Sequence, residues 1–199
     1  DTISYTVSDG NGGTAAASVA VTVTPVNDLP VASDSSKGTG ENAVLASSVP
    51  AATDVDGTIV CYTLATDLGA GNGSLLFNAD GSYTFTPGSD FDALADGASR
   101  DVTFTYTATD DQGGVSAPKT VTITVTGTND VPVASDSSKS TGENTVLSSS
   151  VPAATDVDGT VASYTLGTGL GAGNGSLVFN SDGSYTFTPG SDFDALADG

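Results

Sequence analysis

The chain has 199 residues, and 24 aspartate and glutamate residues against 4 lysine and arginine residues give it a formal net charge of −20. So large a negative charge argues against a nucleic-acid or anionic membrane partner and favours a cationic one. No apolar stretch approaches the roughly 18 residues of a membrane span, which argues against direct membrane insertion.

The sequence is a tandem array. Residues 31–97 recur at 133–199 with a constant offset of 102 and ten substitutions, and the first thirty residues match residues 102–132. We therefore predict three units: the C-terminal strands of a preceding repeat (1–31), a complete repeat (32–131), and a third repeat without its last two strands (132–199). Because a repeat of about a hundred residues is itself domain-sized, the units are expected to join end to end.

The composition favours strands. Methionine, tryptophan and histidine are absent, and much of the apolar content comes from β-branched and aromatic residues. In chain order, the complete repeat first predicts strands near residues 42–47 and 58–65. A loop follows at residues 69–73, where the sequence GAGNG is too rich in glycine for a regular element.

Two hairpins complete the repeat. The first covers residues 75–86 and places Tyr83 and Phe85 on its inner face. The second covers residues 102–126, where apolar residues alternate with threonines on both sides of the turn DDQGG. This alternation predicts strands with one buried face and one wet face.

Six or seven short strands in about a hundred residues predict an all-β fold. The expected architecture is a series of antiparallel β-sandwich domains, immunoglobulin-like or cadherin-like, arranged end to end. The linkers at residues 25–31 and 127–133 are short and contain Pro30 and Pro132, so they should limit bending.

Little in the sequence indicates catalysis. Cys61 is the only cysteine and is replaced by Ser163 in the next copy, which excludes an intrachain disulfide and a thiol shared by the repeats. Histidine is absent and no serine lies in a nucleophile motif. Asp90 and Asp92 imitate a glycosidase pair, but nothing nearby marks a substrate cleft. We predict that the chain is not an enzyme.

Several short motifs resemble those of cadherins and occur in the same order. The linkers read VNDLP and TNDVP, similar to the cadherin inter-domain element Asn-Asp-x-x-Pro. Gly-Glu-Asn, Asp-Val-Asp-Gly and Ala-Thr-Asp-Asp-x-Gly-Gly accompany them. The segment from FTPGSDF to GTND is closer still to the VCBS and cadherin-like repeats of large bacterial surface adhesins. The resemblance covers essentially the whole chain.

This resemblance implies Ca²⁺ sites at the junctions between repeats, where carboxylate and amide oxygens supply the ligands that this hard cation prefers. At the first junction the implied ligands are Asn27, Asp28, Asp54, Asp56 and Asp110. At the second they are Glu41, Asn129, Asp130, Asp156 and Asp158, with Asp90 or Asp92 as further candidates. Some elements of the cadherin pattern are missing, so one or two ions per junction are expected.

The leading functional hypothesis is a structural extender of a bacterial surface adhesin or extracellular fibre, rigidified by calcium and located at the cell surface. Its partners would be neighbouring repeats of the same chain or of identical chains, with host-cell or surface glycans bound through other domains. One alternative is a glycan- or ligand-binding adhesion module. Another is a filament subunit in which the incomplete ends of different molecules exchange strands head to tail. The simpler interpretation of the incomplete ends is that the sequence is a window on a longer continuous array.

Overall fold

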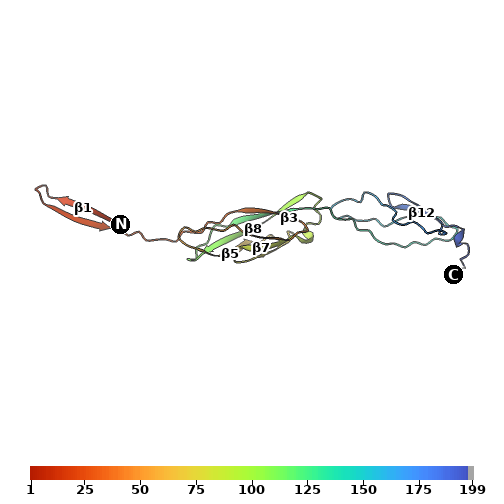
Figure 1. Cartoon of the computed structure of the whole chain (residues 1–199), viewed down its shortest axis with the longest axis horizontal. Helices are drawn as coiled ribbons and strands as arrows, with labels where there is room; N and C mark the ends of the chain where they lie inside the picture. Colours follow the sequence, from red (N-terminus) through yellow and green to blue (C-terminus); the bar gives the residue numbers. More distant parts are fainter. Residues whose placement is uncertain (197–199) are drawn as a thin grey trace.

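A computed structural model describes residues 1–196 as an elongated row of three β units (Figure 1). A two-stranded hairpin lies at the N-terminal end, a two-layered unit in the middle, and a single sheet at the C-terminal end. The regular structure is almost entirely strand, with two three-residue 3-10 turns, so the all-β prediction is confirmed. Within the described residues, no helix is long and apolar enough to cross a membrane.

The N-terminal unit is a hairpin of β1 (Thr2–Ser8) and β2 (Thr14–Ala20), paired antiparallel. Every residue of both strands is exposed, although Ile3, Tyr5 and Val7 alternate along β1 as in a strand with one buried face. An isolated two-stranded hairpin is only marginally stable in water. The apolar side of this hairpin is therefore uncovered.

The central unit is a sandwich of two sheets with the strand orders β3–β9–β8–β5 and β4–β7–β6. β3 runs parallel to β9, whereas the other neighbouring strands are antiparallel. A 3-10 turn at Gly88–Asp90 follows β7. The strands are β3 (Ser35–Gly40), β4 (Leu45–Ser48), β5 (Ile59–Thr66), β6 (Ser74–Phe77), β7 (Ser82–Thr86), β8 (Ser99–Asp110) and β9 (Lys119–Thr126).

An aromatic core lies between the two sheets. Tyr83 of β7 meets Phe104 of β8 edge to face, with ring centroids 5.1 Å apart, and Phe77 of β6 lies 5.9 Å from Phe104. Tyr106 is fully buried, and its hydroxyl donates to the carbonyl oxygen of Ser33 at 2.7 Å. Phe85, Phe91, Val121, Ile123 and Val125 are also fully buried. Burial of this apolar surface holds the two sheets together.

Both predicted hairpins and the strand at 58–65 are confirmed. The strand predicted from residue 42 begins instead at Leu45, because the N–H of Ala43 donates to the carbonyl oxygen of Gly40 and closes a turn there. β3 was not predicted, since its sequence SSKGTG has no apolar alternation and its backbone pairs with a strand distant in sequence.

The C-terminal unit contains one sheet of β10 (Leu147–Ser150), β12 (Ser184–Thr188) and β11 (Ser176–Phe179), followed by a 3-10 turn at Ser191–Phe193. This sheet repeats the β4–β7–β6 sheet of the central sandwich. Residues 137–142 and 161–168, the copies of β3 and β5, are not strands. Within the described chain they have no counterparts of β9 and β8 to pair with.

Candidate functional site

The first linker joins the central sandwich through Asn27 and Asp110. The side-chain amide of Asn27 donates to Oδ2 of Asp110 at 3.0 Å, and Oδ1 of Asp110 accepts the backbone N–H groups of Gln112 at 2.9 Å and Gly114 at 2.7 Å. The bond from Asn27, followed by the backbone N–H groups, lowers the pKa of Asp110. This buried carboxylate is therefore held in its ionised form beside the linker.

Asp54 and Asp56 lie at the same end of the sandwich, in the turn before β5. The backbone N–H of Asp28 donates to Oδ1 of Asp56 at 3.2 Å, which ties the linker to this turn. Oδ1 of Asp54 accepts the N–H groups of Asp56 at 3.1 Å and Gly57 at 2.9 Å. Two buried oxygens at this junction, Oδ2 of Asp54 and Oδ1 of Asn27, have no hydrogen-bond partner within residues 1–196.

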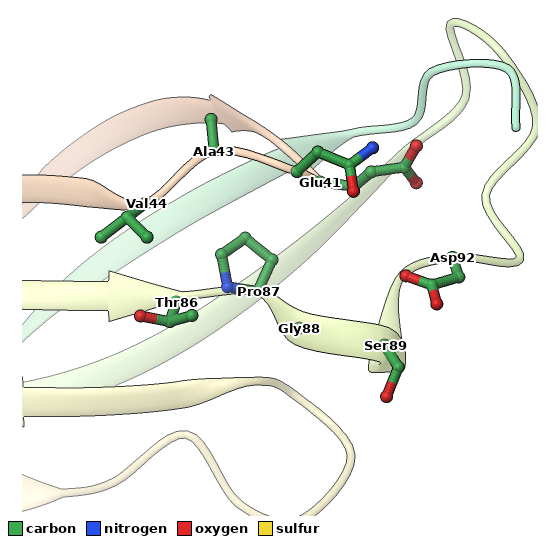
Figure 2. Close-up of a pocket in the computed structure, with 9 residues that line it drawn as sticks. Glu41, Ala43, Val44, Thr86, Pro87, Gly88, Ser89 and Asp92 are labelled. Atoms are coloured by element: carbon green, nitrogen blue, oxygen red, sulfur yellow. The ribbon is translucent and has the colours of Figure 1, made fainter.

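At the opposite end of the sandwich, Glu41 anchors the second linker. Its side chain is only 2% exposed, and Oε1 accepts both the backbone N–H of Thr128 at 2.7 Å and the hydroxyl of that residue at 2.8 Å. Its other oxygen, Oε2, is buried and has no hydrogen-bond partner in the part of the chain that the structure describes. Glu41 and Asp92 line one hollow of about 290 Å³ at this end of the sheets (Figure 2).

Asp130 brings carboxylates from both sides of the second junction together. Its backbone N–H donates to Oδ1 of Asp158 at 3.2 Å, and its own side chain is half-buried. Burial, and then the negative charges of Glu41, Asp158, Asp92 and Asp156, raise the pKa of Asp130. The second junction is therefore a region of negative potential. Carboxylates of the central unit, the linker and the C-terminal unit all contribute to it.

Two of the predicted ligands make other contacts. Asp90 is exposed, and its Oδ2 accepts the backbone N–H of Gly73 at 2.9 Å, so it fastens a loop beside the 3-10 turn. Asn129 is exposed, and its side-chain amide donates to the carbonyl oxygen of Asp130 at 2.7 Å. Asn129 itself belongs to the second linker, and the remaining members of the predicted set lie in or beside the two junctions.

The comparisons with known proteins agree with this architecture. Residues 27–127 match the family described as "Bacterial cadherin-like domain". The chain belongs to this family. Residues 129–198 match the family described as "Bacterial Ig domain". No curated protein matches the chain. The resemblance to cadherin-like repeats of bacterial surface proteins is thereby confirmed.

One solved cadherin structure resembles this cadherin-like chain in fold. PcdhgB3 EC1-4 has a TM-score of 0.53 at 19% identity, over 96% of this chain and 48% of that one. Protocadherin gammaB7 EC3-6 has a TM-score of 0.44 at 18% identity, over 99% of this chain and 50% of its own. Drosophila N-cadherin EC1-4 has a TM-score of 0.38 at 17% identity, over 94% of this chain and 49% of its own. The chain thus spans about half the length of these structures.

Cadherin-like domains generally bind calcium, and the donor chemistry of both junctions fits that ion. Seven buried side-chain polar atoms have no partner in the described residues, and four of them are oxygens of the predicted ligands Asn27, Glu41, Asp54 and Asp156. A buried oxygen without a donor is costly unless a cation or water satisfies it. In residues 1–196 no three acidic or cysteine side chains are already arranged to hold a metal, so the carboxylates would have to draw together.

Two residues that position the site were not predicted. Thr128 donates both its backbone N–H and its hydroxyl to Oε1 of Glu41. Val26, which occupies the matching place in the first linker, has an N–H but no hydroxyl. Asp111 accepts the N–H of Thr58 at 3.1 Å, and its own N–H donates to the carbonyl oxygen of Thr58 at 3.0 Å. Only the adjacency of Asp111 to Asp110 in the sequence could have indicated it.

Proposed function

We propose that this cadherin-like chain is a non-catalytic structural extender of a bacterial surface adhesin or extracellular fibre, and that calcium stiffens its junctions. The observation that carries the proposal is the set of buried, unpartnered carboxylate and amide oxygens, which lies where one unit meets the next. Oxygen donors of this kind suit Ca²⁺ better than any softer metal. The proposed division is a first unit at 1–31, a second at 32–131 and a third at 132–199.

The proposed ligands fall into two groups, one for each linker. At the first junction, Asn27 and Asp28 of the linker would act with Asp54, Asp56 and Asp110 of the central unit. At the second, Asn129 and Asp130 would act with Glu41, Asp156 and Asp158, and Asp92 is better placed than Asp90 to join them. Bound calcium would supply positive charge that neutralises these carboxylates.

The chain's own contribution is to hold negative groups from different units close together. In the absence of a cation, repulsion among Glu41, Asp130 and Asp158 favours separation of the units, and the raised pKa of Asp130 reflects that repulsion together with burial. Neutralisation of the carboxylates by calcium would remove this repulsion and favour one orientation of the neighbouring units. Extracellular calcium modules bind with Kd of about 10⁻⁴ to 10⁻³ M, which matches a location at the cell surface.

The test measures thermal unfolding and shape with calcium and with a chelator. Calcium that binds only the folded chain adds about 2.7 kcal/mol per site at a hundredfold excess over Kd. We expect a higher midpoint of unfolding and, by small-angle X-ray scattering, a narrower distribution of lengths. Equal midpoints and equal scattering in calcium and chelator would refute the calcium mechanism. Magnesium is the control, because its demand for near-octahedral geometry should make its effect smaller.

A further inference from the structure

Arg100, at the start of β8, is one of four basic residues in a chain that has 24 acidic ones. Within residues 1–196, the hydrogen bonds of its side chain go to backbone carbonyl oxygens. Nη2 donates to the oxygen of Gly71 at 2.9 Å and to that of Asp90 at 3.2 Å. The guanidinium carbon also lies 4.0 Å from the centre of the Phe91 ring. Arg100 therefore joins the glycine-rich loop at residues 69–73 to the turn after β7.

The position of Arg100 in β8 explains why it reaches Phe91. Side chains alternate along a strand, so Arg100 shares the inner face of β8 with the buried residues Val102 and Phe104. It pairs with Val125 near the end of β9, just before the second linker. Phe91 is only 1% exposed and meets Phe85 edge to face at 6.1 Å. The guanidinium thus covers the last aromatic ring of the core on the side of the second junction.

Residues 88–98, which connect β7 to β8, are fastened at their far end by backbone bonds. The N–H of Gly97 donates to the carbonyl oxygen of Gly127 at 3.1 Å, and the N–H of Gly127 donates to that of Ala98 at 2.8 Å. These bonds fix the end of the connection against the start of the second linker. The beginning of the connection is held instead by Arg100 and by the bond from Gly73 to Asp90.

The part of the connection that Arg100 holds is the part that carries Asp92. Asp92 follows Phe91 directly, is half-buried, and lines the hollow that Glu41 also lines (Figure 2). Its negative charge is one of those that raise the pKa of Asp130. Because Phe91 is clamped between Arg100 and Phe85, the place of Phe91 decides where the next carboxylate lies.

We propose that Arg100 is a positioning residue of the second junction, which fixes the turn at residues 88–92 so that Asp92 faces Glu41 and Asp130. The inference rests on the proposed calcium function, in which Asp92 is a ligand. Arg100 would act through the backbone of Asp90 and the ring of Phe91, and not through its charge. Groups that orient the ligands of a metal commonly change its affinity about 10- to 100-fold when they are replaced.

The glycine-rich loop is the second support of the same turn. Its Gly71 carbonyl oxygen accepts from Arg100, and its Gly73 N–H donates to Oδ2 of Asp90 at 2.9 Å. Gly73 lies so close to the end of β7 that a Cβ atom there would overlap the carbonyl oxygen of Thr86. The sequence GAGNG therefore lets the loop approach β7 closely enough for Arg100 to bridge the loop and the turn.

Two substitutions separate the shape of Arg100 from its charge. A positive charge beside a calcium site repels the ion, so loss of the charge alone would tighten calcium binding in Arg100→Gln. Loss of positioning would weaken it. Arg100→Lys keeps the charge but replaces the planar guanidinium, which bonds two carbonyl groups while it lies on a ring, by a compact ammonium group. If Arg100 positions Asp92, both variants bind calcium more weakly.

The first measurement is amide hydrogen exchange of residues 1–199 in chelator, resolved by nuclear magnetic resonance. The N–H of Leu94 donates to the carbonyl oxygen of Phe91 at 2.8 Å, so it reports on the turn that Arg100 holds. In Arg100→Lys its exchange should become several-fold faster, because the turn opens more often. The N–H of Gly127, bonded to Ala98, is the internal control and should change less. Equal changes at Leu94 and Gly127, or none, would contradict the positioning role.

The second measurement is a calcium titration followed at two backbone amides. The N–H of Thr128 donates to Glu41 and reports on the second junction, whereas the N–H of Asp28 donates to Asp56 and reports on the first. In Arg100→Lys and Arg100→Gln the Kd seen at Thr128 should rise roughly tenfold, and the Kd seen at Asp28 should not change. Lys37→Gln, which removes an exposed positive charge from β3, is the matched control and should leave both values unchanged. An equal or lower Kd at Thr128 in either Arg100 variant would overturn the proposal.

A double-mutant cycle shows whether Arg100 acts through Asp92. Asp92→Asn alone should raise the Kd seen at Thr128, and Arg100→Lys added to it should raise that Kd little further, because the carboxylate that Arg100 positions is already gone. Fully additive effects would refute action through Asp92. A parent chain with no calcium response at Thr128 would refute calcium at the second junction and this inference with it. A parent that responds, with the same Kd in Arg100→Lys, would refute the role of Arg100 alone.

Discussion

Replacing Glu41 by glutamine tests the calcium mechanism with little disturbance of the fold. Oε1 of Glu41 accepts two hydrogen bonds from Thr128, at 2.7 and 2.8 Å, and the amide oxygen of glutamine can accept both. The change falls on Oε2, the buried oxygen that has no partner. In chelator the variant should be as stable as the parent or slightly more stable, because one of the charges that raise the pKa of Asp130 is removed.

The loss of stability caused by Glu41→Gln is expected when calcium is present. If the loss of one carboxylate ligand weakens binding about tenfold, a calcium concentration at about 100 times the parent Kd is only about 10 times the variant Kd. The stabilisation then falls from about 2.7 to about 1.4 kcal/mol. For a domain of about a hundred residues, the lost 1.3 kcal/mol or so is about 5 to 10 °C in the midpoint of unfolding.

The assay is calorimetry of the parent and the variant, each in calcium and in chelator, and the quantity compared is the shift caused by calcium. Asp67→Asn is the matched control: it removes one negative charge, is not among the charges that raise the pKa of Asp130, and can keep its hydrogen bond from the N–H of Leu68 at 2.7 Å. Its calcium shift should equal that of the parent. A Glu41→Gln chain with an unreduced calcium shift would refute the role assigned to Glu41.

Three further predictions concern pH, the core and one loop. In chelator, acidification from pH 7 should first stabilise the second junction, because the raised pKa of Asp130 lets the folded state take up a proton first. It should then destabilise the first junction, because the lowered pKa of Asp110 gives stability that is present above its ordinary value of 3.8 and lost as the pH falls through the folded value. Melting curves between pH 7 and 3 check both signs, and Asp130→Asn should abolish the first effect only. Tyr106→Phe should cost about 1 kcal/mol in urea unfolding, because the carbonyl of Ser33 loses its donor, and an unchanged stability would contradict that bond. Gly73→Ala should cost about 1–3 kcal/mol more than Gly71→Ala; both glycines have φ near +75°, but only at Gly73 would a Cβ atom meet a backbone oxygen, that of Thr86 at 2.5 Å.

The parts of the fold that the sequence predicted are those with a local signal. The β8–β9 hairpin has strict alternation of apolar residues and threonine around a short turn, and both strands and their buried face follow from it. β3 has no such signal. Its six residues include no apolar side chain, and its place in the sheet depends on a parallel pairing with residues more than eighty positions later. Pairings of this kind cannot be inferred from local periodicity.

For the candidate site, too, the sequence predicted some features and could not predict others. The order of the acidic motifs indicated that Asp54, Asp110 and Glu41 belong near the junctions, and the structure has them there. The sequence could not separate Asp90 from Asp92, two residues apart. A 3-10 turn between β7 and β8 directs Asp90 to the N–H of Gly73, whereas Asp92 lies in the hollow beside Glu41. The geometry of one turn therefore decides which carboxylate faces the junction.

The clearest evidence that pairing outweighs local preference is a comparison of two copies of one segment. Residues 35–40 form β3, and residues 137–142 differ from them only by Gly38→Ser at the matching position, yet form no strand. Serine is no worse than glycine in a strand, so the substitution does not explain the loss. What differs is the partner: β9 lies beside the first copy, and no equivalent lies beside the second in the described residues. The segment thus forms a strand in residues 35–40, where β9 supplies its backbone partner, and the local sequence alone does not impose that conformation.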